Sequence, residues 1–233
     1  MENKKFFFAI IATTFLVILL NFTVPSFAAP TAASVTVGSQ ETAPTQAAGT
    51  VITEGGNITP VNISAYQVTG KWAGFWGNVS GDIRLADSSN NIFYKWTIND
   101  PTGGVVYACN GTVSDWSAAN LAPLYASDGY LPSFLIQGTD AFNSTFTQQE
   151  TFISPSLTIN AVNYTYTYQG GSLGTDFKTY ALRTTAGDVL IWAGKVKASS
   201  TSFKNTVADY QILAGVNAQP PATTTFYFYL ELP

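Results

Sequence analysis

The chain has 233 residues, with 10 Lys and Arg against 14 Asp and Glu, a net charge of -4, one Cys and no His. Without His, a Ser-His-Asp triad, a Cys-His nucleophile and the usual zinc sites are excluded, and a single Cys excludes a CxxC redox pair. The scarcity of Lys and Arg argues against nucleic acid and anionic lipid as partners. Composition therefore favours a non-enzymatic protein.

An export signal is predicted over residues 1–28. Lys4 and Lys5 precede an apolar run over 6–20, and a small-x-small cleavage site ends at Ala28. Cleavage there would leave a secreted chain, extracellular or associated with the cell surface, that does not insert into a membrane. An uncleaved anchor is the alternative, although 15 helical residues reach only about 22 Å, short of the roughly 30 Å hydrocarbon core.

Residues 29–56 contain no aromatic residue, and their only charges are Glu41 and Glu54. The segment is too poor in large side chains to fold alone, yet its valines alternate on one face of a strand. We expect a flexible or strand-donating arm whose Val35 and Val37 fill a groove of a neighbouring subunit. Folding back onto its own domain is the alternative.

Residues 57–233 consist of short β-prone segments separated by turns every 8 to 15 residues. This spacing predicts an all-β fold, a single antiparallel β-sandwich of jelly-roll or Ig-like type. Hairpins are predicted over 83–98 and 177–196, and a last strand over 223–232. The stretch 115–128 is the least β-like, and we expect a loop with a short helix there.

Cys109 lies in the apolar run Val105–Cys109. An unpaired thiol in such a run usually behaves as a small buried hydrophobe, which is the favoured interpretation. An odd Cys in an exported protein can also pair between chains, so an intermolecular disulfide is the alternative.

The tryptophans are candidates for surface contacts with sugar rings. Trp72 and Trp76 share one side of a strand around a glycine, and a core position is favoured over an exposed face for both. Trp96 and Trp192 are flanked by apolar strand residues and are expected in the core. Trp116 lies in the irregular stretch and is the best candidate for an exposed binding aromatic.

Six Asn-x-Ser/Thr sequons follow residue 28, more than chance composition provides, which predicts N-glycosylation at some of them. The candidates are Asn57, Asn62, Asn78, Asn110 and Asn143. A sixth, Asn163, lies in a Tyr-rich strand and is the least favoured. The alternative is that a β surface rich in Thr and Asn contains sequons by chance and that they carry no glycan.

The carboxylates are scattered about one per turn. A glycosidase needs two of them across a cleft, and no spacing here requires that Asp100 and Asp128 meet. No cofactor is predicted. Calcium is the one metal that the oxygens of Asp87, Asn90 and Asn91, or of the Asp100 turn, could bind, although no EF-hand spacing is present.

The run from Trp72 to Asp87 and the following Phe93-Tyr-Lys-Trp96 resemble a group of secreted archaeal surface β-proteins with a WxGxxGNVxGxIxLxD motif leading to FYxW. The likeness extends from about residue 55 to the end and implies no activity and no functional residues. In layout alone, the chain is also similar to jelly-roll subunits of extracellular filaments, which lend an N-terminal strand to a neighbour.

Together these observations predict an exported, non-enzymatic structural glycoprotein of the cell surface that self-assembles through strand addition, with itself as partner. The alternative is a surface adhesin or glycan-binding module that uses exposed tryptophans and binds cell-surface glycans.

Overall fold

The computed structural model describes residues 29–233, and the predicted export signal at 1–28 lies outside them. Every strand pair in the described chain is antiparallel and its helical segments are at most four residues long, which confirms the all-β prediction. The strands are β1 (Thr31–Ala32), β2 (Trp72–Gly77), β3 (Asp82–Ala86), β4 (Ile92–Thr97), β5 (Val105–Cys109), β6 (Leu121–Pro123), β7 (Gln148–Ile153), β8 (Thr158–Gln169), β9 (Ser172–Thr184), β10 (Leu190–Lys195), β11 (Ser200–Thr201), β12 (Val207–Ala208), β13 (Tyr210–Gly215) and β14 (Tyr227–Glu231). The helical turns are η1 (Ala126–Asp128), η2 (Ser133–Ile136) and α2 (Phe142–Thr145).

Eight strands form one large sheet in the order β1-β14-β5-β10-β9-β8-β7, with β6 paired to part of β9. The central strands β5 and β10 are the apolar runs VVYAC and LIWAGK, which are buried almost throughout. Continuous apolar runs are typical of strands covered on both faces. The predicted hairpin over 177–196 is confirmed as β9–β10, and the last strand begins at Tyr227, later than predicted.

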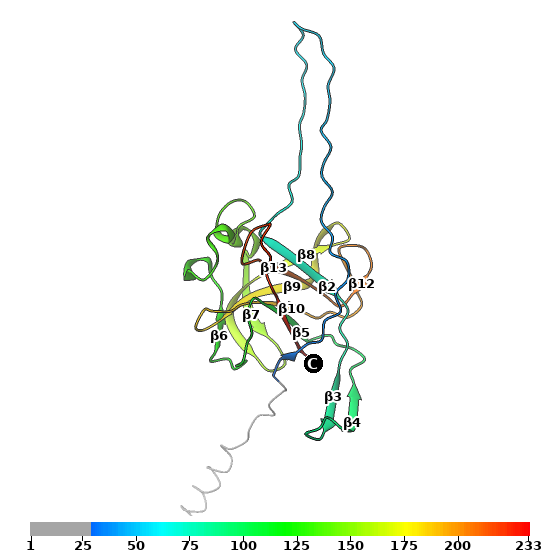
Figure 1. Ribbon diagram of the computed structural model, residues 1–233, viewed down its shortest axis with the longest axis vertical. Coiled ribbons are helices and arrows are strands. Elements are labelled where there is room, and N and C mark those ends of the chain that lie inside the picture. Colours follow the sequence, from blue (N-terminus) through cyan, green and yellow to red (C-terminus); the bar gives the residue numbers. More distant parts are fainter. Residues whose placement is uncertain (1–28) are drawn as a thin grey trace, which may run out of the picture.

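Apolar side chains pack on both faces of this sheet. On β5, Tyr107 contributes to one cluster and Ala108 to the other, and Ile191 and Trp192 alternate in the same way on β10. Residues of β7 and β8 complete the first cluster. The two-stranded sheet β13–β2 lies across β9 and β10 and covers the second, together with the segment 124–146 (Figure 1).

Strand β13 approaches β10 closely because Gly194 has no side chain. A Cβ atom at Gly194 would overlap Cγ1 of Ile212 on β13. The backbone N–H of Leu213 also donates a 3.1 Å hydrogen bond to Oγ1 of Thr179 on β9. The small residue thus allows the two layers to meet at this point.

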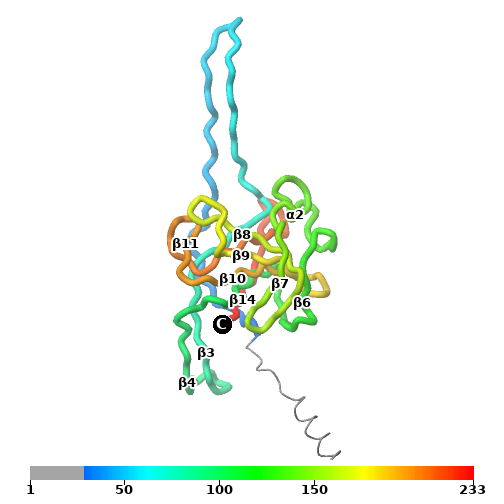
Figure 2. The backbone as a smooth tube through the Cα atoms, turned by 180° about the vertical axis from the view of Figure 1, so that it is seen from behind, coloured from blue at the N-terminus to red at the C-terminus, as the bar shows by residue number. Residues whose placement is uncertain are grey.

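A long arm leaves the domain as two extended legs (Figures 1 and 2). Residues 38–54 run outward, a turn closed by the Asn57 N–H and the Glu54 carbonyl follows, and residues 57–70 return. No strand ladder joins the legs. Only scattered contacts do so, such as the 2.6 Å hydrogen bond from the Tyr66 hydroxyl to the Pro44 carbonyl. The composition boundary near residue 56 therefore marks the tip of the arm.

The predicted hairpin over 83–98 is confirmed as β3–β4, but it stands apart from the body of the domain. It projects at the end opposite the arm, and both views show it there (Figures 1 and 2). Strand β1 and the C-terminus lie at the hairpin's end of the domain. No helix among residues 29–233 has the length and apolarity needed to cross a bilayer.

The stretch 115–128 departs from the prediction. It contains the short strand β6, and its helical turn is η1, close to its end, where the sequence suggested helix near Trp116. Asp115 accepts a hydrogen bond from the Ser117 N–H, and its carbonyl accepts one from the Asn120 side chain. These contacts fold the chain into a turn instead of a helix.

Candidate functional site

Strand β1 lies on the edge of the large sheet, against β14 of its own chain. Ala32 is opposite Tyr229, and the Ala33 N–H donates a 3.0 Å hydrogen bond to the Phe228 carbonyl. The ladder is short, because β1 has only two residues. The outer edge of β14 is therefore covered by a small segment that leads directly into the exposed arm.

The predicted donor residues Val35 and Val37 lie just beyond this ladder. They and the neighbouring alanines line a shallow groove of about 410 Å³ along Phe226 and the first three residues of β14. Val35 is 50% exposed and Val37 is 76% exposed. The start of the arm thus follows its own domain, as the alternative interpretation held, but its valines are poorly buried there.

The β3–β4 hairpin is amphipathic. Ile83 lies opposite Trp96 and Leu85 opposite Tyr94, so these four side chains share one face. All four are about half exposed, and the rings of Tyr94 and Trp96 pack at 4.7 Å. Nothing in the described chain covers this apolar face.

The other face of the hairpin carries its charged side chains, beside the exposed ring of Phe93. Arg84 lies opposite Lys95, and both pair with Asp82. The hydrogen bond from Arg84 lowers the pKa of Asp82, and the charges of both cations add to this effect. Asp87 in the connecting turn supplies a second carboxylate, so the hairpin as a whole is neutral.

Trp96 is therefore half exposed on a projecting hairpin, and the prediction that it lies in the core is wrong. The prediction is confirmed for Trp192, which is fully buried. The two sequences differ, since Trp192 lies in a continuous apolar run and Trp96 between Lys95 and Thr97. For Trp96 the pattern was ambiguous, because an amphipathic strand has the same alternation whether or not a second layer covers its apolar face.

Trp116 is buried, so the expectation that it exposes a binding ring is wrong. Its ring packs between Tyr107 at 4.7 Å and Tyr229 at 5.0 Å. The turn around residues 115–120 carries the indole under the edge of the sheet. An irregular backbone therefore supplies a core side chain here.

Trp72 and Trp76 have different environments. Trp72 is half-buried against Phe146 and Trp192, and its indole N–H donates a 2.7 Å hydrogen bond to the Asp140 carbonyl. Trp76 is 39% exposed and meets Phe203 edge to face at 5.4 Å. The core interpretation holds for Trp72, whereas Trp76 remains a surface aromatic.

The sequons divide by exposure. Asn57, Asn62, Asn78 and Asn143 are exposed. Asn110 is half-buried: its side-chain amide donates to Asn217, and its side-chain carbonyl accepts the Leu190 N–H at 2.8 Å. Asn110 is thus held inside the fold, unlike the other four candidates.

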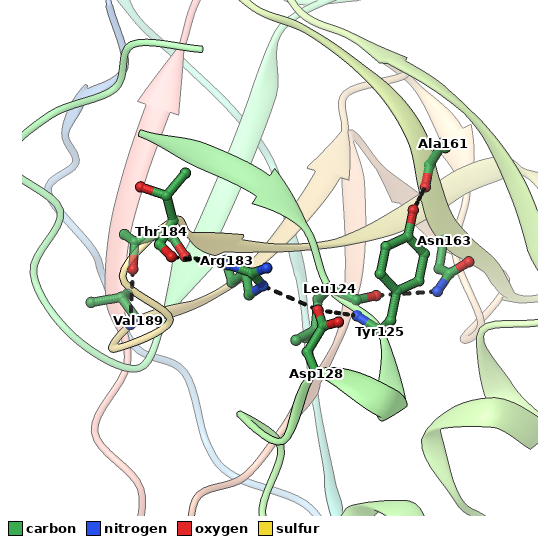
Figure 3. A network of polar contacts seen from close by, with 9 residues as sticks. Leu124, Tyr125, Asp128, Ala161, Asn163, Arg183, Thr184 and Val189 are labelled. Carbon is green, nitrogen blue, oxygen red and sulfur yellow. Dashed lines mark hydrogen bonds and ion pairs between the residues drawn. The ribbon is translucent and has the colours of Figure 1, made fainter. Parts of the chain in front are cut away.

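The sixth sequon is also engaged. The amide of Asn163 donates a 3.1 Å hydrogen bond to the Leu124 carbonyl, within a network that ties residues 124–128 to β8 and β9 (Figure 3). In this network Asp128 accepts hydrogen bonds from Arg183 and from the Tyr125 N–H, both at 3.1 Å. The Asp128 carboxylate is therefore a structural anchor.

The turn carboxylates considered for calcium bond to their own turns. Asp87 accepts hydrogen bonds from the backbone N–H groups of Ser89 and Asn91 and from the Asn91 side chain. The contacts with Asn91 and Ser89 lower the pKa of Asp87. Asp100 likewise accepts the Thr102 N–H. Among residues 29–233, no three Asp, Glu, Cys or His side chains are grouped as a metal site.

Cys109 is a free, fully buried thiol, as favoured from the sequence. Burial raises the pKa of this thiol far above its ordinary value, so the reactive thiolate does not form at neutral pH.

Two exposed features were missed from the sequence: the returning leg of the arm and the uncovered face of the hairpin. Alternation over 83–96 was the available signal for the hairpin. Comparisons with protein-family models, with curated proteins and with solved structures find no match to this chain. The surfaces themselves are thus the basis for a functional proposal.

Proposed function

We propose that this chain is an exported, non-enzymatic structural protein of the cell surface that self-assembles by strand addition, with a jelly-roll or Ig-like β-sandwich as its body. The observation that carries the proposal is the two-residue strand β1, which covers the edge of β14 at the start of a long, exposed arm. Export is supported by the sequence pattern over 1–28 alone.

Exchange of β1 between copies would preserve its contacts. An uncovered strand edge is a template for another chain, and β1 satisfies only part of it. Residues 38–54, fully extended at about 3.3 Å per residue, reach roughly 55 Å, enough to carry β1 to a neighbouring domain. The same ladder formed between copies links subunits into a polymer if the exchange does not close on itself.

Disulfide trapping tests this exchange. Continuing the register of the β1–β14 ladder by two residues places Ser34 opposite Tyr227, and both side chains are exposed. In a Cys109→Ala background, a Ser34→Cys chain is mixed with a Tyr227→Cys chain and oxidised. We expect a disulfide-linked dimer whose yield rises with concentration. The matched control replaces Tyr227→Cys with Thr175→Cys, an exposed position on β9, and should stay monomeric.

A chain that carries both Ser34→Cys and Tyr227→Cys reports the opposite outcome, in which β1 stays on its own domain, through an internal disulfide. If this chain only closes an internal disulfide at every concentration, and the mixed single variants never link, the segment stays on its own domain. Negative-stain images of the mature chain that show only monomers would agree with that outcome and reject the proposal.

A surface glycan-binding module is the second candidate, and Trp76 favours it. The ring is partly exposed beside Gly74, where a Cβ would meet open space, so a flat ligand could approach. Aromatic faces of this kind stack on apolar ligand faces. Glycan-array binding that is lost in Trp76→Ala but kept in Phe93→Ala, an exposed ring on the hairpin, would support it.

A further inference from the structure

The two exposed features of the domain lie at opposite ends. The arm extends from one end, whereas the β3–β4 hairpin projects from the other (Figures 1 and 2). Copies stacked in the same orientation would bring the arm of one to the hairpin of the next. A contact between different surfaces of identical chains is heterologous, and it propagates into a filament when it does not close into a ring.

The hairpin has strand edges without a neighbouring strand, and the arm has extended backbone without a strand partner. The hairpin is a two-stranded sheet of its own, so the outer edges of β3 and β4 have no strand beside them in the described chain. The legs of the arm are extended but join no ladder within it. Side-chain hydrogen bonds between the legs occupy the backbone groups of Pro44, Ser64 and Tyr66, and most of the others are left for strand pairing. Main-chain pairing of an extended segment with an open edge is β-augmentation.

One segment of the arm matches the hairpin in side-chain pattern. In Val61–Ala65, Val61, Ile63 and Ala65 alternate with Asn62 and Ser64, so one face is apolar and the other polar. Val61 is 50% exposed and Ile63 is 89% exposed.

Strand β3 has the same alternation. Ile83 and Leu85 on β3 share the apolar face and are spaced two residues apart, as Val61 and Ile63 are. Aliphatic side chains paired across neighbouring strands stabilise a sheet.

Area argues against the simplest competing contact, two hairpins face to face. The four half-exposed apolar side chains of one hairpin offer roughly 400 Å². A stable interface needs about 800 Å² from each partner. A stable interface at the hairpin therefore has to bury more surface than this face offers, and a long arm can supply the additional area.

We propose that residues Val61–Ala65 of one copy add as a third strand to the open β3 edge of the hairpin in the next copy, with Val61 and Ile63 extending its apolar face. This inference rests on the proposed self-assembly. It adds a second contact between neighbouring subunits, distinct from the exchange of β1.

Two charge variants test this contact in the full mature chain. Ile63→Asp places a carboxylate on the apolar face of the added strand, and we expect it to raise the concentration needed for assembly by more than about tenfold. The matched control Ser64→Asp puts the same charge on the opposite face of the same strand and should assemble as the wild type does. All chains are produced without glycosylation, because Ser64→Asp also removes the Asn62 sequon. Leu85→Lys should impair assembly from the hairpin side.

Mixing the two impaired chains gives the decisive result. In either strand direction, position 63 lies opposite or diagonal to position 85, within reach of a Lys side chain. An Ile63→Asp chain and a Leu85→Lys chain can therefore alternate, because every second contact is then an ion pair and the others are native. We expect the mixture to assemble although neither chain does so alone. Thermal unfolding of each chain shows that its domain remains folded.

The possible failures are distinguishable. If Ile63→Asp assembles normally while Leu85→Lys does not, two hairpins meet face to face and the arm contact is wrong. If Leu85→Lys instead abolishes binding to zwitterionic phosphatidylcholine vesicles and leaves assembly intact, the hairpin binds lipid and the inference is also wrong. In both cases the β1 disulfide of the previous section still forms. If the wild type never associates, both proposals fail.

Discussion

The hydroxyl of Tyr107 donates a 2.6 Å hydrogen bond to the carboxylate of Glu231, and both side chains are almost completely buried. The contact joins β5 to the end of β14. Burial, together with the charge of Glu231, raises the pKa of Tyr107, so the phenol remains a hydrogen-bond donor at all ordinary pH values. β14 is thereby anchored on its inner side, whatever occupies its outer edge.

Tyr107→Phe removes this donor and leaves the buried carboxylate with one partner fewer. We expect the free energy of unfolding to fall by about 2 kcal/mol, the range for hydrogen bonds to charged groups. Urea unfolding measures it. Tyr168→Phe, at a tyrosine that is 58% exposed, should leave the midpoint unchanged. Equal midpoints for Tyr107→Phe and the wild type would show that the carboxylate is satisfied in another way.

Trp116→Ala is predicted to destabilise the domain, because the indole is a core side chain and not a binding ring at the surface. Removing an indole packed between Tyr107 and Tyr229 should cost about 3 to 5 kcal/mol. Trp76→Ala, at a partly exposed ring, should cost much less. Thermal unfolding of the two variants compares them directly. A Trp116→Ala protein as stable as Trp76→Ala would place the Trp116 ring at the surface.

The sequence predicted where the strands lie better than it predicted which segments pack against them. Val105–Cys109 and the first five residues of β10 are apolar throughout, so their burial follows from composition. The turn at 185–188 likewise defines its hairpin locally. What pattern alone did not provide is which apolar faces are covered, because that depends on contacts between segments far apart in the chain.

The tryptophans illustrate this limit. Trp96 and Trp192 both lie in β-prone strands, yet one projects on a hairpin and the other is at the centre of the sheet. Trp116 lies in an irregular segment but is buried, because a turn of only a few residues is enough to direct one ring inward. The arm shows the same limit. Its aromatic-free part ends at the tip, and the returning leg contains Tyr66, so the absence of aromatic residues identified only the outgoing leg.

Glu150 should make the stability of the domain depend on acid pH. Burial acts to raise its pKa, but hydrogen bonds from Lys178, at 2.7 Å, and from Tyr180 outweigh this and lower the pKa below its ordinary 4.5. A carboxylate with a lowered pKa stabilises the fold above its unfolded pKa, and this stabilisation disappears as the pH falls through the folded value.

Glu150→Gln is therefore expected to reduce the free energy of unfolding by about 1 kcal/mol at pH 7, a modest figure because the side chain is partly exposed. The difference from the wild type should shrink toward zero by pH 3. Chemical unfolding at both pH values measures it, and Glu54→Gln on the exposed arm is the control. A difference that persists at pH 3 would mean that packing, and not ionisation, is responsible.

Glycan attachment should follow the exposure of each sequon. We expect modification among Asn57, Asn62, Asn78 and Asn143, whose side chains are exposed. We expect none at Asn110, because its amide and carbonyl are both bonded within the fold and a glycan on its nitrogen would break the contact with Asn217.

Intact mass and peptide mapping of the protein purified from its source measure this. The polypeptide mass provides the baseline, and Asn163, whose nitrogen donates to Leu124, is an internal control that should stay bare. Glycans on Asn110 or Asn163 in folded protein would mean that these hydrogen bonds do not form. An intact mass equal to that of the bare chain would reject glycosylation altogether and leave the polar surface of the arm as plain amide and hydroxyl groups.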